Sequence, residues 1–340
     1  MIYGNIFCEG FTNNSLFDFA NPRNSDGLFT PYIVLREKLL EFGIELNTPD
    51  LNIGRHVSLE VHMDSRLLVK NDALQYLIAV ENPLINQLNA DVEYLKKFHR
   101  VFSWNDAALV HPHAVKIFIA NDLSMSNAPS FSGRNVFACL ISSNKVAPWF
   151  GDNDLYAERI NVVRWYEKHA PSFFHLYGRG WGKPSHVFSR KDKFLRRIGR
   201  IRTQLFGYKP FPSWRGEVTT KADILSTAKF SYCYENVSDM PSYITEKIFD
   251  SFLSGCVPVY WGANNVLDYI PENCFIDRRD FKDTAEVHQH LLSITPEKYA
   301  QYQQNIAAFL TSEKGYLFGI ENFVDTVANT FAADLNQGKR

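Results

Sequence analysis

Short apolar runs alternate with helix-like stretches along the whole chain, and this alternation constrains the fold more than any other feature. The apolar runs lie at residues 5–10, 57–63, 75–81, 100–104, 115–120, 135–142, 173–178, 230–235, 257–262 and 274–277. Helical spacing separates several of them, for example at 30–43 and 156–169. Strands that alternate with helices are joined by crossover connections, so the pattern predicts an α/β architecture with parallel sheets rather than a sandwich or a bundle.

The length of 340 residues exceeds what one hydrophobic core usually supports, so two domains are expected. A polar stretch at 144–155, with Pro148 and Gly151, interrupts the pattern and predicts the join. We therefore expect an N-terminal domain over 1–150 and a C-terminal domain over 151–319. Residues 320–335 carry apolar side chains at helical spacing, which predicts an amphipathic helix that packs back on the N-terminal domain.

Charge and cysteine content exclude several classes of protein. The chain has 36 Lys and Arg against 37 Asp and Glu, which argues against a field built to hold nucleic acid. The start, MIYGNIFCEGF, lacks the pattern of a signal peptide, and no run of 18 apolar residues follows, so a soluble, cytoplasmic protein is expected. Five widely spaced cysteines without a CxxC pair predict free thiols in a reducing compartment.

Residues 242–252, SYITEKIFDSF, place polar chemistry at the front of an apolar helix. Ile244, Ile248 and Phe252 recur every four residues, and Gly255 closes the stretch. The apolar run 230–235 precedes it, so the intervening turn leads from the carboxyl edge of a strand into a helix N-terminus. Open α/β sheets bind ligands at this edge, and the helix N-terminus favours an anion. Alternatively, Glu246 and Lys247 are the solvated first turn of an ordinary helix.

The stretch YENVSDMPSYITEKIFDSFLSGCVPVYWGANNVLDYIP resembles the donor-binding signature of glycosyltransferase family 10, the α-1,3/4-fucosyltransferases. Further matches follow the family's order: YAERINVVRWYE, FHLYGRGW and WRGEVTTKADILSTAKFSYCYEN. The similarity covers about residues 130–285 and is loose in the N-terminal half. It implies the GT-B fold, two facing Rossmann-like domains with a cleft between them, and an inverting reaction that does not rely on a DxD-bound metal.

The resemblance also implies roles for single residues. Arg159 and Lys247 would hold the diphosphate of GDP-fucose, and Asn236 the ribose. Tyr243 and Glu246 would lie beside the phosphate and the fucose. Each position also has an ordinary alternative: Arg159 in a surface ion pair, Asn236 as a turn former and Tyr243 as a packing aromatic.

A base for the acceptor hydroxyl is expected on the other domain. Glu81 ends the apolar run QYLIAVE at a carboxyl edge and resembles the position of the family's catalytic glutamate, although AVENP matches only in part. Partial burial would raise its pKa toward a useful value. A glutamate that caps the following turn is the alternative, and Glu60, Asp64 and Asp106 are the reserve candidates.

Several other signals are interpreted as structural. Asp152 and Asp154 form a literal DxD that does not follow a convincing strand, so a polar turn is expected, and the glycines of YGRGWGKP match no phosphate-loop spacing. His111 and His113 are expected in a loop rather than on a metal, and Trp104 either packs in a core or stacks on an acceptor sugar. The basic run at 190–202 is a solvated helix face or a contact with an anionic membrane surface or glycan.

Together these observations predict a fucosyltransferase that moves L-fucose from GDP-fucose to a glycan hydroxyl, O3 of GlcNAc or Glc. No cofactor is expected to be required, with Mn or Mg at most stimulatory. One alternative is another nucleotide sugar on the same scaffold, and a second is a non-catalytic glycan-binding protein, suggested by 14% aromatic residues. An oxidoreductase or epimerase is disfavoured, because the dinucleotide fingerprint is missing.

Overall fold

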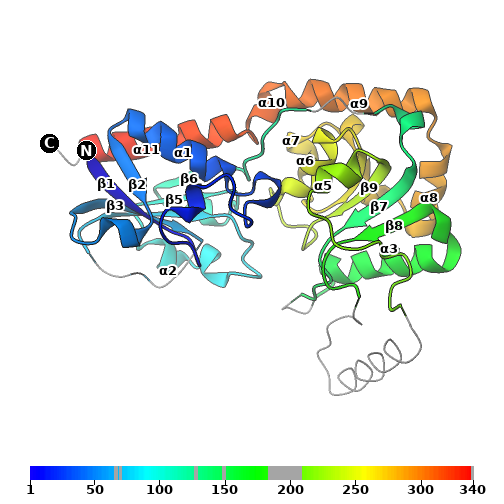
Figure 1. Ribbon diagram of the computed structural model, residues 1–340, viewed down its shortest axis with the longest axis horizontal. Coiled ribbons are helices and arrows are strands. Elements are labelled where there is room, and N and C mark those ends of the chain that lie inside the picture. Colours follow the sequence, from blue (N-terminus) through cyan, green and yellow to red (C-terminus); the bar gives the residue numbers. More distant parts are fainter. Residues whose placement is uncertain (65–67, 69–70, 126–128, 148–150, 183–208, 338–340) are drawn as a thin grey trace, which may run out of the picture. The chain divides into compact units, whose positions relative to one another are not determined.

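The computed structural model describes residues 1–64, 68, 71–125, 129–147, 151–182 and 209–337. The chain divides into two compact units, each built around one parallel sheet (Figure 1). Unit 1 consists of Met1–Leu123, Pro241–Tyr243 and Ser312–Arg340, and unit 2 consists of Ser124–Met240 and Ile244–Thr311. The expected α/β architecture with two parallel-sheet domains is confirmed.

Unit 1 contains a six-stranded sheet in the order β2-β1-β3-β4-β5-β6. Its strands are β1 (Ile2–Phe7), β2 (Ile44–Asn47), β3 (Val57–Met63), β4 (Leu74–Ala79), β5 (Arg100–Ser103) and β6 (Ala114–Lys116). Neighbouring strands pair in parallel, for example with Val61 opposite Tyr76. The carboxyl ends of the strands therefore lie along one edge, where the segment after β4 brings Glu81.

Two helices far apart in the sequence cover one face of this sheet. Helix α1 (Thr30–Glu41) and helix α11 (Ile320–Gln337) lie side by side in Figure 1, blue beside red. Val61 of β3 and Val327 of α11 are completely buried in the same apolar cluster. Arg100 of β5 donates through Nε at 2.9 Å to Asp334 of α11, so the C-terminal helix is fixed to the sheet by apolar and ionic contacts.

Unit 2 contains a five-stranded sheet in the order β11-β10-β9-β7-β8. Its strands are β7 (Val136–Ile141), β8 (Phe174–Tyr177), β9 (Ala228–Tyr234), β10 (Val257–Trp261) and β11 (Ile276–Asp277). The helices that position the candidate site are α3 (Leu155–His169), α5 (Lys221–Leu225) and α6 (Glu246–Leu253), and further helices include α8 (Thr284–Ser293) and α9 (Pro296–Leu310). Each βαβ crossover returns the chain to a parallel strand, which explains why apolar runs and helices alternate in the sequence.

Three details differ from the sequence expectations. Strand β1 covers Ile2–Phe7 rather than residues 5–10, and Gly10, with φ of +75°, belongs to the turn that follows the strand. The short strand β2 was not expected. Helix α6 begins at Glu246, so Tyr243 and Ile244 precede it instead of forming its first turn.

The division between the units also lies elsewhere than the polar stretch at 144–155. Unit 2 begins at Ser124, because β7 pairs with β8 and β9 and therefore belongs to the second sheet. Residues 144–155 lie within unit 2, and the helix expected at 320–335 is α11, which lies in unit 1.

Candidate active site

The carboxyl end of β9 and the start of α6 bring together most of the charged residues of unit 2 that the sequence singled out. Strand β9 ends at Tyr234, and Glu235 and Asn236 follow directly. Thr245 is the N-cap of α6, and its hydroxyl accepts from Lys247 N. A strand end therefore meets a helix N-terminus, whose positive dipole end favours an anion and whose first N–H groups donate to Glu235 and to the Thr245 hydroxyl.

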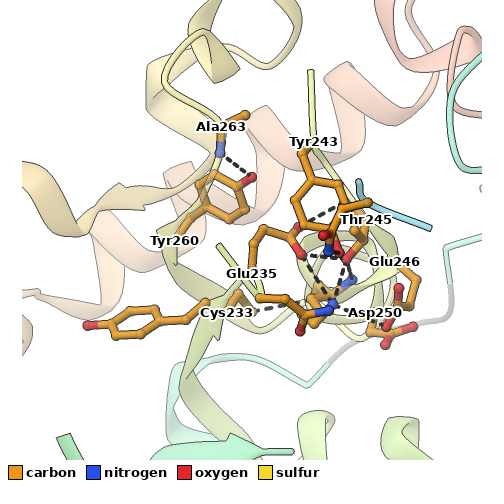
Figure 2. A network of polar contacts seen from close by, with 12 residues as sticks. Cys233, Glu235, Tyr243, Thr245, Glu246, Asp250, Tyr260 and Ala263 are labelled. Atoms are coloured by element: carbon orange, nitrogen blue, oxygen red, sulfur yellow. Dashed lines mark hydrogen bonds and ion pairs between the residues drawn. The ribbon is translucent and has the colours of Figure 1, made fainter. Parts of the chain in front are cut away.

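Glu235 is the central carboxylate of this arrangement, although the sequence interpretation missed it. Its side chain is completely buried and accepts from Thr245 N and Thr245 Oγ1, both at 2.8 Å (Figure 2). Lys247 Nζ lies 3.2 Å from Glu235 Oε2. A charged residue directly after an apolar strand was the available signal, because a strand-end carboxylate can reach the N-terminus of the next helix.

Arg159 lies inside unit 2 and reaches the same strand end from α3. Its guanidinium Nη2 donates to Tyr234 O at 2.7 Å, to Glu235 O at 2.6 Å and to Asn236 Oδ1 at 3.1 Å. The residue is only 5% exposed, which argues against the alternative of a surface ion pair. These contacts fix the guanidinium plane at the carboxyl edge of the sheet and bring Asn236 beside it.

Glu246, the first residue of α6, lies between two lysines. Its Oε1 is 3.6 Å from Lys221 Nζ and 3.7 Å from Lys247 Nζ. Burial alone would raise the pKa of Glu246, but Lys247, Lys221, its own backbone N–H and the Thr245 hydroxyl together lower the pKa to about 2. Glu246 is therefore a stable anion at neutral pH.

Lys221 is a second residue that the sequence interpretation missed. Its Nζ lies 2.7 Å from Asp250 Oδ2, one turn further along α6. Burial alone would lower the pKa of Lys221, but the carboxylates of Glu246 and Asp250 raise it. It stands at the start of α5 in TTKADIL, and nothing in that local pattern distinguishes it from an ordinary solvated lysine.

A small pocket of about 40 Å³ opens among these side chains. It is lined by Arg159, Lys221 and Lys247, by the carboxylate of Asp250, and by further residues at the end of β7, along β9 and on α6. Three cations at one pocket are suited to several negatively charged oxygens, as in a diphosphate. The structure thus brings Arg159 and Lys247 together, as the family resemblance implied, and adds Lys221 to them.

Tyr243 belongs to unit 1, in the short segment Pro241–Tyr243. Its ring packs on Trp104 with centroids 4.8 Å apart, and its hydroxyl accepts from Asn82 Nδ2 at 3.2 Å. Both aromatic residues are buried, in agreement with the alternative roles in packing. The donor-binding role that the resemblance implied for Tyr243 stays a prediction.

Glu81 lies two residues after β4, at the carboxyl edge of the sheet of unit 1. Its Oε1 accepts from Asn82 N at 3.0 Å and from Asn82 Nδ2 at 3.3 Å. Asp64, with φ of +60°, holds the backbone here, because its Oδ1 accepts from Val80 N and Glu81 N at 2.8 and 2.9 Å. Glu81 therefore contacts the following turn, as the alternative interpretation expected, and its role as the base stays a prediction.

The reserve carboxylates have structural partners. Asp64 is the anchor just described. Glu60 is 7% exposed and accepts from Gln75 Nε2 at 3.0 Å within the sheet. Asp106 pairs with Lys116 and accepts from Ser242 Oγ at 3.2 Å. Like Glu81, each of the three is therefore held by hydrogen bonds or an ion pair within unit 1.

The DxD motif and the glycines of YGRGWGKP, both expected to be structural, lie in turns beside helices and strands. Asp154 is the N-cap of α3 and accepts from Tyr156 N at 2.8 Å, as expected of a polar turn. Gly178 has φ of +117°, and a Cβ there would lie 2.0 Å from Ser142 O, so glycine is required by close backbone approach. Within the described residues, no group of three His, Cys, Asp or Glu is arranged to hold a metal ion.

Two further observations concern membranes. Among the residues that the structure describes, no helix combines the length and apolar composition needed to cross a bilayer. The basic run at 190–202 lies outside the described residues, so its contact with a membrane or a glycan stays a prediction.

A known family of glycosyltransferases matches the C-terminal part of the chain. Residues 186–311 match the sequence profile described as glycosyltransferase family 10 (fucosyltransferase), C-terminal part. This segment is therefore similar to the C-terminal part of the family 10 fucosyltransferases. The matched segment includes Glu235, Asn236, Glu246 and Lys247, whereas Arg159 precedes it.

Curated fucosyltransferases are similar to this chain over short segments. An α-(1,3)-fucosyltransferase of Helicobacter pylori is 34% identical over 83 residues, which are 24% of this chain and 17% of the relative. An α-(1,4)-fucosyltransferase of Arabidopsis thaliana is 38% identical over 80 residues, which are 23% of this chain and 20% of the relative. The chain thus spans about a fifth of the length of these relatives.

Solved structures extend the likeness to nearly the whole fold. An α1,3-fucosyltransferase solved with GDP-fucose superposes with a TM-score of 0.54 at 15% identity, covering 96% of this chain and 89% of the other. The Anabaena protein HepE solved with UDP-glucose gives 0.56 at 14% identity, covering 98% and 100%. At such identities the likeness concerns the fold, and the expected GT-B class is confirmed.

Proposed function

We propose that the protein is a fucosyltransferase that uses GDP-fucose as donor and a glycan hydroxyl as acceptor. The observation that carries the proposal is the convergence of Arg159 and Lys247 on one pocket, at the strand end and helix N-terminus of a family 10 domain. Because the pocket is small, only the diphosphate of the donor is assigned to it. Asn236, held beside Arg159, is assigned to the ribose.

The leaving group is the first chemical requirement. When the bond between fucose C1 and the phosphate oxygen breaks, the electron pair remains on GDP, whose charge must be stabilised. Arg159, Lys247 and the N-terminus of α6 supply that stabilisation from fixed positions. In this assignment the side chains provide the positive charge that a divalent ion provides in glycosyltransferases with a DxD-bound metal, so no metal is required.

The fucose ring is the second requirement. Glycosyl transfer develops positive charge on the ring, by analogy with the oxocarbenium-like transition state of glycoside hydrolysis. Glu246 is anionic at neutral pH and adjacent to Lys247, so its carboxylate is assigned to the developing cation. Lys221 and Lys247 keep this carboxylate ionised.

The acceptor hydroxyl is the third requirement. Glu81 is assigned as the base that takes the hydroxyl proton while the acceptor oxygen forms a bond to fucose C1 on the face opposite to GDP. This displacement inverts the anomeric centre. The proposed acceptor atom is O3 of a GlcNAc or Glc residue, and the products are the fucosylated glycan and GDP.

The test is transfer of labelled fucose from GDP-fucose to a panel of small glycans that contain galactose and N-acetylglucosamine, with linkage analysis of the product. Wild-type protein should transfer fucose, and Glu81→Gln should bind GDP without transfer. Glycan binding without transfer or GDP release would favour the non-catalytic alternative.

A different nucleotide sugar on the same fold is the second candidate, because a protein of similar fold has been solved with UDP-glucose. Thermal shift with GDP and with UDP separates the two. GDP should raise the Tm at concentrations where UDP has no effect. Equal stabilisation by both nucleotides would contradict the assignment of guanine.

A further inference from the structure

Asn82 directly follows the proposed base and is completely buried. Both of its N–H groups donate to the same atom, Glu81 Oε1, the backbone N at 3.0 Å and the side-chain Nδ2 at 3.3 Å. Two donors on one carboxylate oxygen define the direction in which the carboxylate plane points. This contact lies wholly within unit 1.

The side-chain amide of Asn82 is itself fixed at both ends. Its Oδ1 accepts from Leu84 N at 3.1 Å and from Ile85 N at 3.2 Å. Its Nδ2 donates to Tyr243 OH at 3.2 Å as well as to Glu81. Because the oxygen faces two backbone donors, the amide orientation is unambiguous, and the nitrogen must point to Glu81 and Tyr243.

The side chain of Tyr243, which accepts from this amide, is held in place by packing. Its ring lies against Trp104, whose Nε1 donates to Val80 O at 2.8 Å, on the strand-end segment that carries Glu81. Tyr243 is therefore attached to the segment around Val80 and Asn82 in two ways, by its ring through Trp104 and by its hydroxyl through Asn82. A side chain held in this way restricts the rotation of the carboxylate next to it.

We propose that Asn82 is the positioning residue of the Glu81 base and that Tyr243 fixes Asn82 in this role. The inference rests on the proposed function, because it takes Glu81 as the base. Asn82 orients the carboxylate of Glu81 before the acceptor arrives, so that less conformational freedom of that side chain is lost during the reaction. Nearby charged groups are Asp64, which accepts from Glu81 N, and Asp106, which is paired with Lys116.

Asn82→Asp tests the role of the amide. The aspartate keeps an oxygen for the N–H groups of Leu84 and Ile85, but it replaces the donor to Glu81 by a second negative charge. The acid limb of the pH profile of kcat/KM should then move upward by about one pH unit, because a like charge disfavours ionisation of the base. Asn24→Asp is the matched control, since its Oδ1 also accepts from a backbone N–H, that of Phe29, and the limb should not move.

Tyr243→Phe is the milder variant and keeps the ring against Trp104. Losing the hydroxyl frees one end of the Asn82 amide, so kcat should fall about tenfold while the KM for GDP-fucose changes less than twofold. A large rise in that KM with unchanged kcat would overturn the inference and support donor binding by Tyr243.

A carboxylate titration by NMR separates failure of this inference from failure of the proposed function. The Glu81 signal, assigned through Glu81→Gln, should titrate at higher pH in Asn82→Asp than in wild type. Unaltered titration of Glu81 would overturn the positioning role. If Glu81 titrates as expected but Glu81→Gln retains full activity, the base assignment is wrong.

Discussion

Lys247 Nζ lies 3.2 Å from Oε2 of Glu235, a carboxylate that has no exposed surface. The pair joins the end of β9 to the first turn of α6, and Thr245 donates to the same carboxylate through both its backbone and its hydroxyl. A buried carboxylate with three donors is well compensated, whereas its removal leaves the backbone N–H of Thr245 without this acceptor and takes one of two carboxylates from Lys247. Glu235, Thr245 and Glu246 thus together hold the ammonium group of Lys247.

The stability of unit 2 should depend on Glu235. Replacing it by alanine removes the acceptor of Thr245 and the buried partner of Lys247, which keeps its contacts with Thr245 Oγ1 and Glu246, and we expect a loss of about 3 kcal/mol in the free energy of unfolding. Urea denaturation measures the loss. Glu272→Ala, at an exposed position of unit 2, is the control and should change stability by less than about 0.5 kcal/mol. An equal effect of the two substitutions would show that the buried pair contributes nothing.

Nucleotide affinity should depend on Lys247. Hydrogen bonds to charged groups contribute about 1.5–3 kcal/mol, so Lys247→Ala should weaken GDP binding roughly 10- to 100-fold and abolish turnover. Isothermal titration with GDP measures the change. Lys298→Ala removes an exposed lysine of α9 and should leave the Kd for GDP as in wild type. Undiminished affinity in Lys247→Ala would remove this residue from the phosphate site.

Low pH should reduce the free energy of unfolding, because it protonates Glu246. Its pKa is about 2 in the folded chain against an ordinary value of 4.5, so ionisation of Glu246 favours the folded state above pH 4.5. That contribution is lost as the pH falls from about 4.5 to about 2. Glu246→Gln should therefore flatten the dependence of unfolding free energy on pH in this window, whereas Glu272→Gln should not. Identical slopes in wild type and Glu246→Gln would contradict the ion-pair assignment.

Catalysis should continue without divalent ions. Arg159 and Lys247 are assigned the charge stabilisation that a metal would otherwise provide, so treatment with EDTA should leave most of the transfer activity. The measurement is the initial rate of GDP release before and after chelation. Complete loss of activity that manganese restores would instead indicate a metal site, with Asp152 and Asp154 as the first candidates.

The parallel sheets were predictable because local sequence carries their signal. Strand β3 was expected at residues 57–63 and is found there, since apolar and polar side chains alternate over seven positions. Strand β2 was missed because Ile44–Asn47 has only four residues, too few for the same alternation to stand out. The first turn of α6 was misplaced because apolar spacing extends over Ile244, whereas the N-cap at Thr245 determines where the helix begins.

The candidate site was predictable only in part. Motif positions identified Arg159, Asn236, Glu246 and Lys247, and the structure gathers these four residues at one sheet edge. Glu235 and Lys221 were missed, because their importance lies in partners 10 or more positions away in the sequence. Tyr243 lies in unit 1 with Pro241 and Ser242, although the chain up to Met240 and from Ile244 belongs to unit 2, and no local pattern signals such a division.

The sequence by itself determined the α/β class, the family 10 signature and the residue types available for phosphate and proton chemistry, because periodicity and motif spacing are local properties. The tertiary structure decided which of those residues meet: Arg159 with the end of β9, Glu246 between two lysines, and Asn82 with Tyr243. Contacts of this kind depend on side chains brought together by sheet pairing and helix packing, and such long-range packing leaves no local mark in the sequence.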